Sequence, residues 1–489
     1  MNKFTVFIFL THVLIGSSAF CETFSVTPGQ SIQDAIDNAA DGDLIVIFGG
    51  SYGQEITIDK AVQLTEATGE EVIISGNVTI TGVTDAPPFR GFNLGAGTTS
   101  LTVENTTGLA VSGVVMNDLN QSGGSVYVSD STINGTWSTA RYRELNPDYL
   151  HHQSPNHPQN QGKEPYLSDE PSERSVGFRV TVNGGCDWDA LRQGWLGYST
   201  VGGTGFSSST SAADDIADPI SVLIGNEIEV EVIPSTTQGQ TPAISVSHSG
   251  EDSSVQIFNN YLASFMSRRD RNRGSSGDIN IYAGAGKVRV QNNYSELAIY
   301  GTPQWLQDHS AIGRGYVAYQ LSGNEVTVRN NVIKGNVEAI GAPANSVVEY
   351  NYADNANHYQ FSAAGGVGFP LTGGCIPTYA ANNDGDLVNT NTGRENDGEA
   401  SYAFIKDSGW WAYDGDDGDV ESLASPDGLY NDRDESRNNA GPGGGPCFDP
   451  EAWTTTKPVV ISFDINPESQ VTGPGAQVIL SNGIAISAP

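Results

Sequence analysis

One stretch of this acidic chain concentrates positive charge. The segment RRDRNR (268–273) has arginine at four of six positions, and Lys287 and His309 follow it. β-Elimination on a uronic acid needs a cation to neutralise the carboxylate, a base to take the adjacent proton, and an acid to protonate the leaving oxygen. The alternative is a solvated turn whose arginines pair with nearby carboxylates. The candidate residues are Arg268, Arg271, Lys287 and His309 for catalysis, and Arg269 and Arg273 for substrate binding.

Carboxylates offer two other kinds of site. A glycoside hydrolase needs two carboxylates at a defined separation, but acids are so plentiful here that no pair stands out. The stretch YDGDDGD sets hard oxygen ligands among glycines, which suits Ca²⁺; the alternative is a solvated acidic turn. The candidate calcium ligands are Asp414, Asp416, Asp417 and Asp419.

Aromatic and cysteine side chains add two further candidates. Trp305 is a candidate for stacking on a sugar ring, although such tryptophans equally pin loops onto a fold. None of the four cysteines shows metal-ligand spacing. Cys375 and Cys447 lie in loop-rich stretches, and we expect them to pair if the chain is exported.

Very short strands must position these side chains. A helix is expected over 31–40 with Ser31 as its N-cap, and three-residue segments of apolar, polar, apolar alternation follow between turn residues. Each segment is too short for an ordinary sheet, but coils of about 20–30 residues that stack would bury one continuous core. The expected strands are 56–58, 62–64, 72–74, 78–80, 101–103, 109–111 and 126–128.

A second repeat ends in paired asparagines. The segments VQIFNNY, VRVQNNY and VTVRNNV share one pattern, and asparagine after a strand suits a left-handed bend. Stacked in register, Asn259, Asn292 and Asn330 would form a side-chain hydrogen-bond ladder. We interpret these asparagines as turn formers and not as a binding site.

These patterns resemble a known superfamily. GQSIQDAIDNAADGDLIVIFGGSYGQEITIDKAVQL (29–64) looks like the N-terminal cap and first coils of right-handed parallel β-helix proteins of the pectin-lyase-like superfamily, and the V-x-V-x-N-N repeats resemble their internal coils. Residues 432–445 resemble a segment that often closes bacterial members, with Glu435 and Asn439 in place of the usual Gly and Asp. The resemblance implies an all-β, right-handed parallel β-helix with an N-terminal capping helix and long loop excursions.

The resemblance is less specific for activity. The superfamily includes lyases, hydrolases, epimerases and non-catalytic surface proteins. The Asp-Asp and Gly-His-Gly motifs of its polygalacturonase-like enzymes do not occur here, and neither does the arginine motif of its pectate lyases.

The chain begins with a pattern typical of export. Lys3, an apolar run and small residues predict a secretory signal peptide over 1–19. The rest is expected to comprise the cap and first coils (20–136), a loop excursion or inserted subdomain (137–250), a β-helix continuation (251–445) with a second excursion (357–430), and C-terminal strands or a cap (446–489).

The net charge of the chain limits the classes of partner that it can bind. The net charge is -34, from 57 acidic and 23 basic residues, which argues against nucleic acid and anionic lipid. No segment after the leader approaches the roughly 20 apolar residues that span a bilayer. We expect a monomer that is extracellular or periplasmic.

Two functions remain open. The leading hypothesis is a secreted protein that binds and cleaves an extracellular polysaccharide, with β-elimination of an anionic glycan by a polysaccharide lyase favoured over hydrolysis. The alternative is a non-catalytic, adhesin-like protein that binds a cell surface or matrix. The enzyme requires charged groups clustered over one groove, whereas the adhesin requires an even polar surface.

Overall fold

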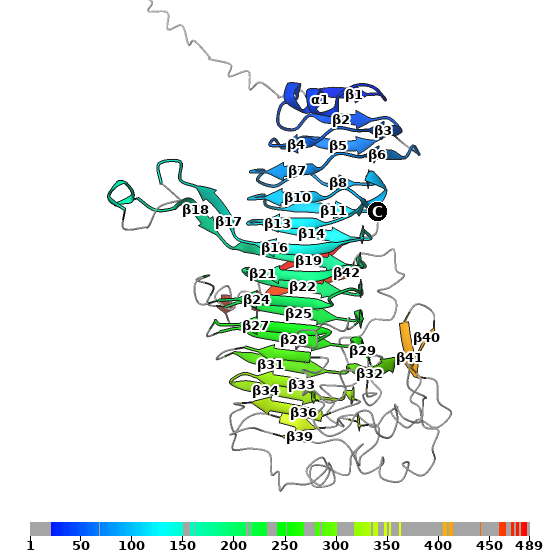
Figure 1. The fold of residues 1–489 in the computed structure, drawn as a ribbon, viewed down its shortest axis with the longest axis vertical. Helices are drawn as coiled ribbons and strands as arrows, with labels where there is room; N and C mark the ends of the chain where they lie inside the picture. The colour runs from blue at the N-terminus through cyan, green and yellow to red at the C-terminus, as the bar shows by residue number, and fades with distance from the viewer. Residues whose placement is uncertain are drawn as a thin grey trace, which may run out of the picture.

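The chain forms a solenoid of short strands stacked along one axis (Figure 1). In each wall of the solenoid, a strand pairs in parallel with the equivalent strand of the next coil. This arrangement confirms the predicted all-β parallel β-helix. The computed structural model describes residues 21–67, 69–149, 157–161, 163–211, 214, 216, 218–231, 242–250, 252–267, 279–283, 286–300, 317–333, 336–340, 347–349, 352–353, 361–362, 404–407, 410–413, 441, 459–465, 471–473, 476–478 and 481–486.

Three parallel sheets, named I, II and III here, form the walls. Sheet I contains β4 (Ile56–Ile58), β7 (Val78–Thr81), β10 (Leu101–Glu104), β13 (Leu119–Ser122), β16 (Thr136–Ala140), β21 (Gly185–Asp189), β24 (Phe206–Thr210), β27 (Ile244–His248), β30 (Ile279–Tyr282), β33 (Val317–Ser322), β36 (Asn336–Ile340) and β39 (Phe361–Ser362). Sheet II contains β8 (Phe89–Arg90), β11 (Leu109–Ser112), β14 (Ser125–Ser129), β19 (Ser172–Phe178), β22 (Leu191–Gly197), β25 (Ile220–Ile224), β28 (Ser254–Phe258), β31 (Lys287–Gln291), β34 (Glu325–Arg329) and β37 (Val347–Glu349). Sheet III contains β3 (Gly50–Tyr52), β6 (Val72–Ile74), β9 (Asn93–Leu94), β12 (Val115–Met116), β15 (Thr132–Ile133), β20 (Thr181–Val182), β23 (Thr200–Val201), β26 (Glu227–Glu231), β29 (Tyr261–Ser267), β32 (Tyr294–Tyr300), β35 (Val332–Ile333) and β38 (Tyr352–Ala353).

Alternation of side chains builds the core. Along each strand, apolar residues at every second position point inward, and coil after coil adds to one buried column. Burial of each Val, Leu or Ile side chain contributes about 1.5–3 kcal/mol. In the middle coils the column becomes aromatic, because Trp188 contacts Trp137 and Phe206 edge-on with ring centroids 5.0 Å apart in both pairs. The strands expected from the three-residue alternation are all present.

A helix closes the N-terminal end, as predicted. α1 (Ile32–Asn38) begins after Ser31, whose hydroxyl accepts a hydrogen bond from the backbone N–H of Asp34 at 3.0 Å. It buries Ile32 and Ile36 against the first coils. A small parallel sheet lies beside it and contains β1 (Thr23–Val26), β2 (Leu44–Ile47) and β5 (Gln63–Glu66).

The cap is also tied to the first strand of sheet I. Gln33 of α1 accepts a hydrogen bond from the backbone N–H of Thr57 at 2.7 Å and donates one to its carbonyl at 3.1 Å. Lys60 donates to the carbonyls of Ile36, Asp37 and Ala39 at the end of the helix. The unpaired edge of β4 is therefore hydrogen-bonded to a side chain instead of to another strand.

The asparagine repeat stacks as predicted, but through the other member of each pair. Asn259, Asn292 and Asn330 have positive φ angles of 56°, 55° and 56°, so they form the left-handed bends. The ladder is built by the residues after them, Asn260, Asn293 and Asn331, and it begins at Asn226. The sequence pointed to the first asparagine of each pair for the ladder, whereas these hydrogen bonds run through the second, which directly follows the left-handed bend.

The predicted excursion over 137–250 is much shorter in the structure. The chain leaves the solenoid after β16 as an antiparallel hairpin of β17 (Tyr142–Leu145) and β18 (Tyr166–Glu170), which projects from its side (Figure 1). It returns at β19, and the strands from β19 to β27 continue the coils. Here several inward positions carry polar residues, which hides the alternation: Ser175, Ser208, Ser221 and His248 are all buried.

The remaining elements are small. The described residues include the 3-10 turns η1 (Gly95–Gly97) and η2 (Pro158–Asn160). Three antiparallel hairpins follow the coils, formed by β40 (Phe404–Asp407) with β41 (Trp410–Tyr413), β42 (Val459–Ile465) with β45 (Ser481–Ile486), and β43 (Val471–Gly473) with β44 (Ala476–Val478). Among the described residues, no helix is long and apolar enough to cross a membrane. The predicted leader over 1–19 lies outside these residues.

Candidate functional site

The outer face of sheet I carries a column of polar side chains. Residues in register on successive strands have outward positions, and from β4 to β27 every member of one column is polar. Neighbouring members are about 4.8 Å apart, the spacing of hydrogen-bonded strands. The column consists of Thr57, Thr79, Thr102, Asn120, Ser138, Asp187, Ser207 and Ser245.

A groove occupies the N-terminal part of this face. Its volume is about 370 Å³, and besides Ile56 its lining is polar: Glu55, Thr57, Asn77, Thr79, Ser100, Thr102 and Asn120. Some of these groups are held by neighbours, since the Ser100 hydroxyl donates to Asp118 at 3.2 Å and Ser138 donates to Asn120 at 2.9 Å. The groove thus crosses four successive coils and presents fixed hydroxyl and amide groups.

Two exposed carboxylates lie further along the same face. Asp187 and Asp189 are two residues apart on β21, so both project outward. Each accepts a hydrogen bond from a serine of the next coil, Ser207 at 2.6 Å and Ser209 at 2.5 Å. One oxygen of each carboxylate is held in this way, so the pair forms an ordered acidic patch.

Sheet I offers these carboxylates no positive charge. Its twelve strands, over the residues that the structure describes, contain no lysine or arginine. The strands of sheet II contain six, among them Arg192, which pairs with Glu173 at 3.1 Å. The two faces therefore have opposite electrostatic character within one solenoid.

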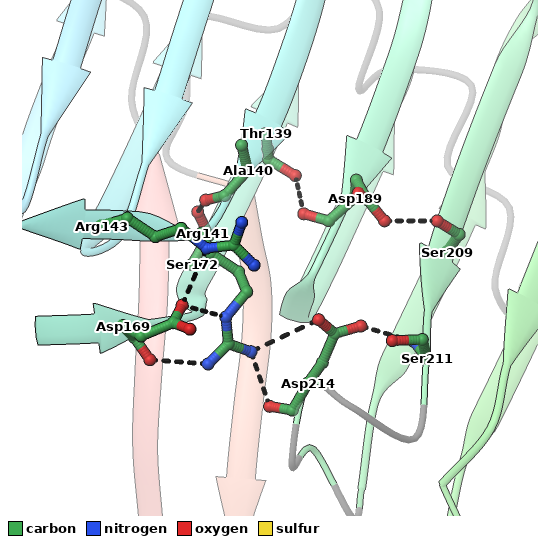
Figure 2. A network of polar contacts seen from close by, with 10 residues as sticks. All are labelled: Thr139, Ala140, Arg141, Arg143, Asp169, Ser172, Asp189, Ser209, Ser211 and Asp214. Atoms are coloured by element: carbon green, nitrogen blue, oxygen red, sulfur yellow. Dashed lines mark hydrogen bonds and ion pairs between the residues drawn. The ribbon is translucent and has the colours of Figure 1, made fainter. Parts of the chain in front are cut away.

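An arginine at the foot of the hairpin is engaged elsewhere. Arg141 contacts Asp169 of β18 at 2.5 Å and Asp214 at 3.3 Å, and it also donates to the carbonyls of both residues (Figure 2). Asp214 also accepts a hydrogen bond from the backbone N–H of Ser211. These contacts attach the hairpin to the coils, so we assign Arg141 a structural role.

The acid partner of Arg141 is held in its charged form. Partial burial favours the neutral form of Asp169, but hydrogen bonds from Arg141 and Arg143 outweigh it and lower the pKa of this carboxyl. Arg143 also lies over the ring of Tyr166, 5.1 Å from its centroid. Ser172 completes the attachment by donating to the carbonyl of Ala140 at 2.9 Å.

The interior contains two groups with reactive side chains that are inaccessible. His248 is buried between Ser208 and Ser221, whose hydroxyls lie 3.2 and 3.3 Å from Nε2. Burial lowers the pKa of His248 to about 4, so it is neutral near pH 7. Burial also raises the pKa of the Cys186 thiol, which keeps it protonated. Neither group can act on an external substrate.

Of the candidate catalytic, substrate-binding, calcium-binding and disulfide residues, only Lys287 lies among those described. It is on β31 in sheet II, and its ammonium lies 3.8 Å from Glu325 of the next coil. It therefore faces away from the polar column of sheet I. The other candidates lie outside the described residues: Arg268, Arg269, Arg271, Arg273, Trp305 and His309, the acids Asp414, Asp416, Asp417 and Asp419, and the cysteines Cys375 and Cys447.

The sequence contained a signal for the acidic patch. GCDWD alternates apolar and acidic residues, which places Asp187 and Asp189 on one side of a strand. Because we expected a loop excursion over 137–250, we did not assign Asp187 and Asp189 to the outer face of a strand.

Comparisons with known proteins leave the activity open. No protein family matches the sequence, and no curated protein matches it. Among solved structures, the chain is similar to one titled "Crystal structure of pectate lyase Pel9A", with a TM-score of 0.32 and 10% sequence identity over 86% of this chain and 96% of that one. A likeness at this level carries no inference about activity, and the fold is established by the strand pairing itself.

Proposed function

We propose that this protein is an exported β-helix that binds an extended polysaccharide along the outer face of sheet I. The observation that carries the proposal is the unbroken polar column over eight coils together with the groove at its N-terminal end. A repeat of about 4.8 Å along the axis is close to the length of one pyranose unit, so successive sugars would meet equivalent groups.

The chemistry of the column suits sugar hydroxyls. Threonine and serine hydroxyls both donate and accept, and asparagine offers two donors and an acceptor. Because these groups are partly held by neighbouring coils, little side-chain entropy is lost on binding. An even polar surface of this kind supports the non-catalytic, adhesin-like function over the described part of the face.

Cleavage is a second candidate, supported by the arginine cluster at 268–273. These residues follow β29 directly in the chain, and an arginine can bond a carboxylate through two parallel hydrogen bonds. For β-elimination, the uronate would have to lie beside this cluster, since sheet I provides no cation. Calcium at Asp414, Asp416, Asp417 and Asp419 would be a further source of positive charge.

Binding to a panel of neutral and anionic oligosaccharides tests the proposal. We expect Thr79→Ala combined with Thr102→Ala to weaken the best ligand by about tenfold, since each lost hydrogen bond contributes roughly 0.5–1.5 kcal/mol. The matched control is Thr181→Ala with Thr200→Ala on sheet III. Equal loss in both double variants, or no binding by the parent protein, would refute the assignment of sheet I.

Cleavage is tested separately. Arg268→Ala and Arg271→Ala should each reduce the release of unsaturated ends from an anionic glycan, and more strongly at low salt. If no glycan yields unsaturated or new reducing ends, the protein binds without cleaving.

A further inference from the structure

The face that we propose binds glycan carries several acids among its hydroxyl and amide groups. Besides the hydroxyls of the column, its outward groups include Glu55, Glu104, Asp187 and Asp189. The described strands of sheet I contain no lysine or arginine that could offset these charges. A polymer lying along the column would therefore pass over a run of negative charge.

Two described cations that follow strands of sheet I are already engaged. Lys60 follows β4, but its ammonium donates to three helix carbonyls. Arg141 follows β16, and its guanidinium contacts Asp169 and Asp214 (Figure 2). Neither can turn toward a ligand without giving up those contacts, so a carboxylate on the ligand would meet repulsion without compensation.

From this we infer that the outer face of sheet I selects uncharged glycans and excludes uronate polymers. The inference rests on the proposed binding function and names the class of ligand. Carboxylates accept hydrogen bonds from neutral sugar hydroxyls, so the acids that exclude uronates contribute to binding a neutral chain. Asp187 and Asp189 exert the strongest selection because they are exposed and adjacent.

The test compares matched hexasaccharides at low salt. Cellohexaose, xylohexaose and mannohexaose are the neutral probes, and hexagalacturonate is the anionic one. We expect a neutral probe to bind the parent protein at least tenfold more tightly than hexagalacturonate. In Asp187→Asn with Asp189→Asn, the ratio of anionic to neutral affinity should rise about thirtyfold, because each of the two removed like charges is worth about 1 kcal/mol at 4 Å in water.

Two controls distinguish selection by the face of sheet I from general repulsion of anionic glycans by an acidic protein: the salt dependence of the affinity ratio and a matched variant. The rise in ratio should fade as ionic strength approaches about 1 M, where the screening length is near 3 Å. Asp85→Asn with Asp252→Asn removes two exposed charges from connections between sheets I and II and should leave the ratio unchanged. An equal rise in this control would overturn the inference.

The two proposals fail in different ways. If the threonine variants on sheet I reduce binding but hexagalacturonate binds the parent as tightly as the neutral probes, selection is refuted and binding stands. If no probe binds the parent, the binding function is refuted and selection falls with it.

Discussion

Two polar columns run along this solenoid, one inside it and one on its surface. The inner column is the ladder of Asn226, Asn260, Asn293 and Asn331, and each of these residues is fully buried. The outer column of sheet I repeats polar residues with the same coil spacing but is exposed to solvent over part of its length. Repetition of polar residues alone therefore does not distinguish structure from function.

The inner and outer columns differ in how many of their polar atoms already have a hydrogen-bond partner within the protein. Asn293 donates to the carbonyls of Ile257 and Gln291 and to the side chain of Asn331, and its own oxygen accepts from Asn260. Nothing remains for a ligand. On sheet I, by contrast, the hydroxyls and carboxylates bond at most in part to neighbouring coils and keep capacity toward solvent. A buried column specifies the register of the coils, and an exposed one is available for recognition.

The largest expected effect is at the inner column. Asn293→Ala would leave the backbone N–H of Asn260 buried without a partner, at about 1–3 kcal/mol, and would remove side-chain hydrogen bonds to the carbonyl of Ile257 and to Asn331, each worth about 0.5–1.5 kcal/mol. We expect the free energy of unfolding to fall by about 4 kcal/mol, measured by urea denaturation. Asn120→Ala on the outer column is the control and should change it by less than about 0.5 kcal/mol. Similar losses in both variants would remove the distinction between the columns.

A smaller effect is expected at His248, a buried side chain that uses only part of its hydrogen-bonding capacity. His248 has a folded pKa of about 4 against an ordinary 6.5, so its neutral form stabilises the fold fully above pH 6.5. As the pH falls from 6.5 to 4, the unfolded chain gains a proton that the folded chain does not. Stability should therefore decrease by about 3 kcal/mol over that window and not further below it.

His248→Gln supplies the comparison for this pH dependence. The difference in unfolding free energy between the parent and the variant, measured from pH 7 to 4, isolates the histidine from the many carboxylates. A difference that stays constant with pH would show that His248 is not held neutral in the fold.

The smallest expected effect is at the edge of the outer column. Arg141→Ala should leave Asp169 and Asp214 without their cation and loosen the hairpin, with a loss of about 2 kcal/mol because the guanidinium is mostly buried. Limited proteolysis should then cut within 142–170 while the coils stay protected. Arg143→Ala, which removes an exposed pair, is the control. Unchanged resistance in Arg141→Ala would contradict the anchoring role.

The sequence predicted the coils where alternation was plain and failed where it was interrupted. Segments such as 78–80 and 101–103 place apolar residues inward without exception, so the strands could be located. Over 172–248 the inward positions include Ser208 and His248, whose polarity is offset by hydrogen bonds to each other. Those bonds depend on contacts between coils, which a sequence does not display.

The polar sites were also only partly predictable from the sequence. The ladder of Asn260, Asn293 and Asn331 follows left-handed bends at Asn259 and its equivalents, and both residues of each pair suit either role chemically. Asp187 and Asp189 could be placed on one side of a strand, but which carboxylates Arg141 contacts depends on the folded structure. The arginine cluster at 268–273 stays a prediction.

The side chain of Gln33 affects whether two molecules of this protein can associate end to end. By bonding the amide and carbonyl of Thr57, it occupies backbone positions where a further strand would add to sheet I. End-to-end stacking of solenoids through that edge, the first step toward a fibre, would require these bonds to break. A single glutamine on the cap thus opposes filament growth by a protein whose architecture otherwise favours adding one more coil.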